Sequence, residues 1–157
     1  MFTFKTMTTA CALAAALLLA HAPQAHASAV PDPAPAHPEL RPVLDQFGGR
    51  EGLIVLMDEF MAIMLDNPQL RPFFEFTDQA EVKRHLVDQF CVILGGDCTY
   101  TGRDMRESHQ GLGITRAEFN ALVEDLQTAM NRRGIPFRAQ NRLLAKLAPM
   151  HREMIER

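Results

Sequence analysis

The sequence predicts an all-α fold, and three observations lead to this prediction. Apolar residues recur at spacings of three and four along most of the chain after residue 44. Capping signals and glycine or proline stops divide this pattern into separate segments. No stretch alternates apolar and polar residues over a useful length, so no strand is predicted. We expect one helical domain over residues 44–157, and roughly 115 residues can bury a single core.

The first 27 residues have the three regions of a secretory signal peptide. Lys5 lies near the start, an apolar run follows over residues 10–20, and Ala25-His26-Ala27 is a small-x-small cleavage site. The run has about ten residues, well short of the ~20 that span a bilayer as a helix. We therefore expect cleavage before Ser28, no membrane anchor afterwards, and a periplasmic or secreted protein.

Residues 28–43 are rich in proline and predict an extended, semi-rigid linker, because proline fixes φ and removes backbone donors. The chain has 16 Lys and Arg against 19 Asp and Glu. Without Lys5 the count is 15 against 19, a net charge of −4. This balance gives no indication of nucleic acid or anionic lipid as a partner.

The first helix is expected over residues 51–66. The pair Asn67-Pro68 ends it, because proline cannot donate the next backbone hydrogen bond. Thioether sulfur suits copper(I), so a copper-binding protein using Met57, Met61 and Met64 is an alternative at this stage. The apolar stripe of the helix consists of Leu53, Leu56, Met57, Phe60, Met61, Met64 and Leu65.

The second helix is expected to begin after Asp78, which forms a capping-box pattern with Glu81 three residues later. Gly95-Gly96 ends it, because glycine favours the backbone conformation that stops a helix. Its apolar side chains again recur at helical spacing. They are Val82, Leu86, Phe90, Ile93 and Leu94.

Two further helices complete the predicted domain. The third follows the capping-box pair Thr115 and Glu118, and Gly134 with Pro136 closes it. The fourth carries the last apolar side chains of the chain. The stripe of the third helix is Phe119, Leu122, Val123, Leu126 and Met130, and that of the fourth is Leu143, Leu144, Leu147, Met150 and Met154.

The segment from Tyr100 to Thr115 separates the second and third of these helices and contains His109. It has no long apolar stripe and three glycines, so we expect a loop or a very short helix facing the packed helices. Functional residues concentrate on loops carried by a rigid scaffold. A histidine here can be a base, a metal ligand or a surface residue. The sequence has no Cys-x-x-Cys-His stretch, which excludes covalent haem attachment of the c type.

Four segments stand in collinear order from about Leu44 to Ile155: LDQFGGREGLIVLMDEF, LDNPQLRPFF, LGGDCTYTGRDMRESHQGLGIT and LAKLAPM. Together they resemble the group I truncated haemoglobins, the small two-over-two helical globins, including their two glycine pairs. The resemblance implies a noncovalent haem b with His109 as the proximal axial ligand to iron.

The resemblance also implies apolar walls around the haem, with Phe74 packing on the haem face. Val82 would contact the haem from the second helix, and Lys83, Arg84 and Arg103 are candidate partners for the haem propionates. Each remaining wall candidate equally suits ordinary core packing. These candidates are Phe60, Phe90, Met105, Ile114, Phe119 and Met150.

The distal side departs from the family pattern. Met61 stands where the family usually has a tyrosine that donates a hydrogen bond to bound oxygen, and Val82 and Leu86 stand where glutamine or another polar residue is common. A hydrogen bond to a charged group contributes about 1.5–3 kcal/mol, so its loss should speed oxygen release roughly ten- to a hundredfold. The resemblance therefore implies reversible binding of O2, NO or CO in an apolar pocket rather than tight storage.

His85 opens an alternative, because it stands where some group I members have a histidine that binds iron directly. Two axial histidines would suit electron transfer or gated ligand binding. Flanked by Lys83 and Arg84, His85 equally suits solvent or a haem propionate. Nitric oxide dioxygenation is a further alternative, and it would require an unknown reductase for which the sequence offers no domain.

Cys91 and Cys98 are the only cysteines outside the predicted signal peptide. In an oxidising compartment they are a candidate disulfide, and closing a loop of about eight residues contributes on the order of 2.5 kcal/mol. Such a bond would clamp the second helix to the segment leading to His109. Two reduced, buried thiols are the alternative.

Overall fold

The computed structural model describes residues 32–156. The predicted signal peptide, 1–27, and the first residues of the predicted linker lie outside this range. The described residues form helices joined by turns, and none of them forms a strand. The elements are η1 (Pro38–Leu40), α1 (Arg41–Gln46), α2 (Gly49–Asp66), α3 (Arg71–Phe74), α4 (Gln79–Ile93), α5 (Met105–His109), α6 (Arg116–Arg132), α7 (Phe137–Leu147), η2 (Ala148–Met150) and α8 (His151–Met154).

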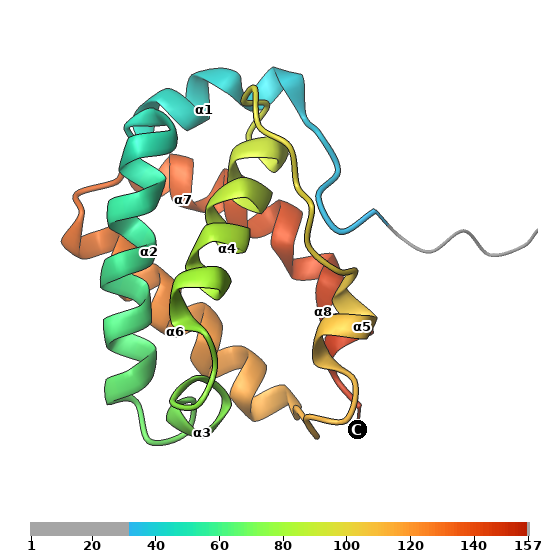
Figure 1. The fold of residues 1–157 in the computed structure, drawn as a ribbon. Coiled ribbons are helices and arrows are strands. Elements are labelled where there is room, and N and C mark those ends of the chain that lie inside the picture. Colours follow the sequence, from blue (N-terminus) through green and yellow to red (C-terminus); the bar gives the residue numbers. More distant parts are fainter. Residues whose placement is uncertain (1–31, 157) are drawn as a thin grey trace, which may run out of the picture.

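The long helices form two layers around one core. Figure 1 shows α2 and α4 side by side in front, with α6 and α7 crossing behind them. Helix α2 packs against both α4 and α6, and α7 contacts α4 and α6. The short α5 lies at the side of the molecule, where it packs against α8. This arrangement is the two-over-two helical sandwich that the sequence predicts. None of the helices within residues 32–156 is long and apolar enough to cross a membrane.

The caps that begin the predicted helices are present. The Asp78 side chain accepts a hydrogen bond from the backbone N–H of Glu81 at 3.0 Å, which satisfies one of the free donors at the start of α4. Thr115 and Glu118 form both halves of a capping box at the start of α6. The beginnings of these two helices are therefore determined by contacts within four residues.

The predicted fourth helix is interrupted. Helix α7 ends at Leu147, residues 148–150 form the 3-10 turn η2, and α8 follows. Pro149 lies at this break, and it has no N–H to donate in a continuing α-helix. The prediction of one continuous helix was wrong here, and the break turns α8 toward α5.

The proline-rich segment is not wholly extended. Residues 38–46 form η1 and α1, with Pro38 and Pro42 in the first turns, where a missing N–H costs nothing. Ala34 and Leu40 are buried, at 6% and 1% exposure. The C-terminal part of the predicted linker therefore packs on the globular domain.

The turn after α4 shows why a glycine ends that helix. Gly95 has φ +72°, and a Cβ at this position would lie 2.7 Å from the carbonyl oxygen of His37. Glycine therefore allows both the left-handed backbone and the close approach of the segment before η1.

The methionines of α2 lie in the hydrophobic core. Met57, Met61 and Met64 are at most 4% exposed and belong to one buried apolar cluster. Their thioethers therefore pack as core side chains, and the structure gives no support to the copper-binding alternative.

Candidate functional site

His109 is the last residue of the short helix α5. The carboxylate of Asp104 caps this helix by accepting a hydrogen bond from the backbone N–H of Glu107 at 2.7 Å. The prediction of a loop or very short helix is confirmed. The imidazole is half-buried, so it lies at the boundary between the packed helices and the surface.

The imidazole of His109 has the form that binds a metal. Its Nδ1 is 2.6 Å from the carbonyl oxygen of Met105, one turn earlier, and because a carbonyl only accepts, Nδ1 donates. Nε2 is then the unprotonated nitrogen with a lone pair. Burial lowers the pKa of His109 below its ordinary value, against the smaller opposing effect of the Met105 hydrogen bond. The ring is therefore neutral near pH 7.

The C-terminal segment holds the turn that follows His109. Glu156 accepts a hydrogen bond from the backbone N–H of Gly111 at 2.5 Å, and its own N–H donates to the carbonyl of Ile114 at 3.1 Å. Leu112 N–H donates to the carbonyl of His109 at 3.2 Å. Helix α5 and the turn after it are thus supported by α8 and by Glu156, which lies 45 positions after Gly111.

Helix α4 supplies an opposite wall. Val82, Leu86 and Gln89 follow one another at spacings of four and three, which places them on one face of the helix. Gln89 Nε2 lies 3.7 Å from Met105 Sδ in α5 and 4.0 Å from Met150 Sδ in η2. This face of α4 is therefore directed toward α5 and the C-terminal segment.

Gln89 was missed by sequence reasoning. It is only 5% exposed, and its amide also donates to the carbonyl of Pro33 at 2.6 Å. A glutamine three residues after Leu86 on the apolar face of a predicted helix is a signal that could have found it. Its partner could not be found, because Pro33 lies 56 residues away.

The predicted wall residues fall into two groups. Phe60, Phe90, Met105, Ile114 and Met150 are buried, and the distal candidate Met61 is buried with them on α2. Side chains of the second group are only half-buried, although each packs on the core cluster. This group comprises Phe74, Val82, Leu86 and Phe119, from α3, α4 and α6.

His85 lies at the edge of the same helix face. Its Nε2 is 3.5 Å from a carboxylate oxygen of Glu81 and 3.2 Å from a guanidinium nitrogen of Arg84. Its Nδ1 is buried and has no hydrogen-bond partner among the described residues. The ring packs edge-on against Tyr100, with the centroids 5.9 Å apart. His85 is therefore held at the surface of α4 with one unsatisfied nitrogen.

Two of the side chains predicted to pair with haem propionates lie close to carboxylates of the protein instead. The ammonium of Lys83 is 2.6 Å from the carboxylate of Asp58 on α2, and a guanidinium nitrogen of Arg84 is 3.8 Å from Asp88. Arg103 is exposed, and its carbonyl accepts the Tyr100 hydroxyl at 2.8 Å. In this structure the charge of Lys83 is directed to α2.

A disulfide joins Cys91, near the end of α4, to Cys98 in the segment that leads to α5. Their Cα atoms are 5.9 Å apart, within the usual range for such a bond.

Tyr100, two residues after Cys98, packs edge-on against the His85 ring. Burial raises the pKa of Tyr100, with a smaller contribution from the charge of Asp104 against the opposing effect of Arg103, so its hydroxyl stays protonated and donates.

The structure is a two-over-two helical sandwich with one neutral imidazole on the short helix α5, opposite a face of α4. The comparisons with known proteins show the family to which this fold belongs. The family model of the bacterial-like globins matches residues 42–156. The chain belongs to this family, and within it to the group 1 truncated haemoglobins, which implies haem-based gas binding.

Two curated relatives share this assignment. The group 1 truncated haemoglobin GlbN of Mycolicibacterium paratuberculosis is 34% identical over 112 residues, which cover 71% of this chain and 82% of the relative. GlbN of a Nostoc species is 33% identical over 91 residues, 58% of this chain and 77% of the relative.

Solved structures are similar in fold. The truncated haemoglobin of Tetrahymena pyriformis in its Fe(III) form superimposes with a TM-score of 0.70 at 22% identity, covering 73% of this chain and 98% of that one. A two-over-two haemoglobin of Synechococcus with covalently attached haem gives a TM-score of 0.68 at 22% identity, with the same coverage of both chains.

Proposed function

We propose that this chain holds a noncovalent haem b through His109 and binds diatomic gases such as O2, NO and CO reversibly. The observation that carries the proposal is the hydrogen bond from His109 Nδ1 to the carbonyl of Met105, 2.6 Å long. It selects the tautomer in which Nε2 is free to bind a metal, and it orients the ring.

The surrounding residues suit a porphyrin. A porphyrin is mostly apolar and planar, so it needs apolar side chains on both faces. The half-buried side chains of Phe74, Val82, Leu86 and Phe119 have apolar surface that such a ring would cover. A bound haem would supply an iron that can bind a gas, and His109 would hold that iron from the side of α5.

The residues assigned to the distal side have no hydrogen-bond donor in their side chains. Met61 is buried and apolar, Val82 and Leu86 are half-buried and apolar, and the nearby amide of Gln89 donates to the Pro33 carbonyl. A gas ligand there would be held by the iron and by apolar contacts alone. Fast release and reversible exchange follow, because no hydrogen bond to a developing charge slows dissociation.

A bis-histidine haem protein for electron transfer is the second candidate. The specific observation in its favour is His85, whose buried Nδ1 lacks a partner. The contacts of Nε2 with Glu81 and Arg84 hold the ring in place while it is not a ligand. Nitric oxide dioxygenation stays an alternative that would require a reductase.

The test is an absorption spectrum of the haem-loaded chain, reduced with dithionite and free of gas. The gas-binding proposal expects one broad visible band, typical of five-coordinate iron, that does not change in His85→Ala. Sharp, split bands that disappear in His85→Ala would instead assign His85 as the sixth ligand and contradict the proposal.

The noncovalent attachment is tested separately by extraction into acidified butanone. We expect the colour to leave the protein, because the sequence has no Cys-x-x-Cys-His motif that would attach the haem covalently. Haem that stays with the chain would contradict this part of the proposal and leave gas binding untouched.

We also propose that the protein works in the periplasm or outside the cell. The support is the signal-like sequence of residues 1–27 and the disulfide, a bond that persists in oxidising compartments. Cell fractionation and sequencing of the mature N-terminus should recover a chain beginning at Ser28. An uncleaved cytoplasmic chain would refute the proposal.

A further inference from the structure

The charge of the chain is distributed unevenly. The 27 residues from 126 to 152 contain six Lys and Arg and no Asp or Glu. The rest of the chain therefore has 10 basic against 19 acidic residues, although the whole chain is net −3. This basic segment runs from the second half of α6 through α7 to the start of α8. The overall balance, which gave no indication of an anionic partner, conceals it.

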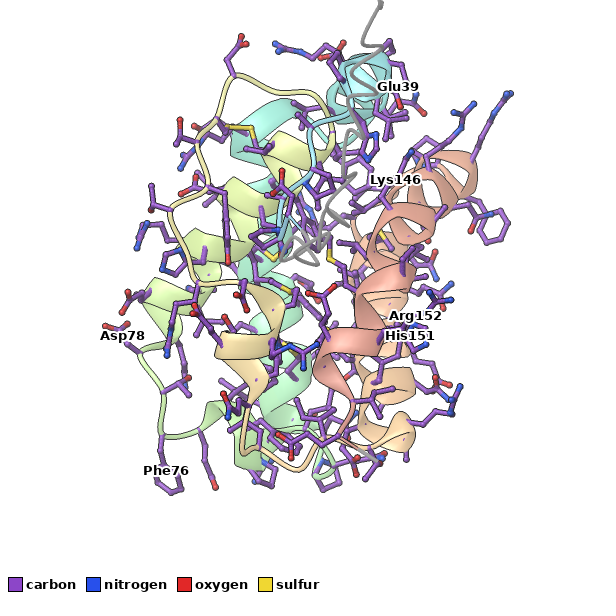
Figure 2. The ribbon with its side chains drawn as sticks, turned by 90° about the vertical axis from the view of Figure 1, so that its right-hand side faces the viewer. Glu39, Phe76, Asp78, Lys146, His151 and Arg152 are labelled. Atoms are coloured by element: carbon purple, nitrogen blue, oxygen red, sulfur yellow. A yellow bond between two sulfur atoms is a disulfide. The ribbon has the colours of Figure 1, made fainter. Side chains whose placement is uncertain are left out.

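Two of these six cations form ion pairs within residues 32–156 and four do not, one of which, Arg152, lies apart on α8. Arg132 pairs with Glu59 at 2.9 Å, and Lys146 lies 3.8 Å from Glu39, a pair labelled at the upper end of Figure 2. By contrast, Arg133, Arg138 and Arg142 are exposed. Within residues 32–156 no carboxylate lies in ion-pair distance of any of these three.

An exposed aromatic ring stands among them. Phe137, the first residue of α7, is 69% exposed. Arg138 follows it, Arg142 lies one turn further along α7, and Arg133 precedes it in the turn from α6. The buried face of α7 is formed by other side chains, namely Ala139, Gln140 and Leu143. We call Arg133, Phe137, Arg138 and Arg142 the α7 patch.

We propose that the α7 patch docks the protein on a membrane surface that contains anionic phospholipids. One guanidinium group can bind two phosphate oxygens at once. An aromatic ring is stable at the level of the lipid headgroups, with its apolar face toward the acyl chains. Two arginines along α7, a third in the turn before it and a ring at the start of the helix suit a flat anionic layer above an apolar interior. An acidic protein partner, unlike a membrane, would need a specific apolar pocket for the Phe137 ring.

The position of the patch is compatible with the proposed haem site. In Figure 1 the turn from α6 into α7 lies on the opposite side of the molecule from α5. Docking through this turn leaves α5 and its histidine uncovered. Because O2 and NO are apolar and dissolve well in lipid, a globin at the membrane surface would exchange gas directly with the bilayer.

The experiment is co-sedimentation of the haem-loaded chain with vesicles containing about 30 mol % phosphatidylglycerol in phosphatidylcholine, or phosphatidylcholine alone. All variants carry the same N-terminus, so any binding by residues 1–31 is common to them. We expect R133Q/R138Q/R142Q to bind the anionic vesicles about a hundredfold more weakly, about fivefold for each arginine. We expect F137S to lose about tenfold, also at high salt, where screening has weakened the arginine contribution.

The matched control is R106Q/R116Q/R152Q, which removes the same charge from three exposed arginines outside the α7 patch, one each on α5, α6 and α8. It should lose much less affinity than the α7 triple variant. Equal losses in the two triple variants would show general charge attraction and overturn the proposal. A wild-type chain that does not sediment with anionic vesicles would overturn it too, as would capture of an acidic protein without any lipid binding. Unchanged haem spectra and melting temperatures verify that each variant is folded.

Discussion

Helix α4 presents one wall of the site from a fifteen-residue helix, whereas α5, which carries His109, has only five residues. Helix α4 packs along α2, and the disulfide joins its C-terminal end to the segment that leads to α5. Helix α5 depends on a cap at Asp104 and on contacts with α8 and Glu156. Helix α4, the long wall of the site, is stabilised by burial, whereas helix α5, the short wall, is stabilised by a few hydrogen bonds. His109, the proposed iron ligand, is thus placed where small local changes should alter its position.

Removal of the proposed iron ligand should have the largest effect. We expect His109→Ala to weaken haem binding by more than about a hundredfold, since loss of an outer partner of a ligand already costs ten- to a hundredfold. Haem transfer to apomyoglobin measures the loss, and added imidazole should restore part of the spectrum. His37→Ala is the matched control and should retain haem. Equal haem retention in both variants would show that His109 is not the ligand.

The disulfide tests the long wall. We expect its reduction to lower the free energy of unfolding by about 2.5 kcal/mol, because the opened loop of about eight residues regains conformational freedom in the unfolded chain. Denaturant titrations with and without dithiothreitol measure the difference. In the variant C91A/C98A, reductant should change nothing. An oxidised wild type as unstable as its reduced form would contradict this account of α4.

A donor introduced into the distal side should slow gas release. We expect Met61→Tyr to decrease the O2 dissociation rate about tenfold relative to Met61→Phe, because the two differ only in the hydroxyl that donates. Stopped-flow displacement of O2 by CO measures both rates. The comparison holds the added ring volume constant at a position that is 4% exposed. Identical rates would place Met61 outside the reach of the gas.

The cap of the short wall should give the smallest effect. We expect Asp104→Ala to destabilise α5 by about 1 kcal/mol and to raise the rate of haem loss about fivefold, because the Glu107 N–H loses its acceptor. Asp104→Asn, which keeps a cap, should lose haem nearly as slowly as the wild type. If Ala and Asn behave alike, the charge of Asp104 matters and its cap does not.

Sequence reasoning reached much of the fold through short-range signals. The starts of α4 and α6 were predicted because Asp78 and Thr115 bond to groups two or three residues away. The break at Pro149 was missed, although its signal was present in the sequence. The apolar stripe across residues 143–154 concealed it.

For the site, too, the sequence predicted a residue marked by its local context but not the partners that residues of the site meet across the fold. The sequence indicated His109, and the resemblance gave it a role, while the structure added the Met105 carbonyl that selects its tautomer. Lys83 was expected to face a propionate, but Asp58, 25 residues earlier, lies close enough to pair with it. Tyr100 over His85 was also not predicted. Which of several possible partners a polar side chain meets depends on how the helices pack.

By itself the sequence determined the helical periodicity, the caps, the cysteine spacing and the position of one histidine between two helices. These depend on contacts within one or two turns, which backbone geometry dictates wherever the segment lies. Only the tertiary structure decided that Gln89 binds Pro33, that α8 supports α5, and that no carboxylate of residues 32–156 lies in ion-pair distance of Arg133, Arg138 and Arg142. These outcomes join or separate residues far apart in the chain, because only the packing of whole helices sets which distant groups meet.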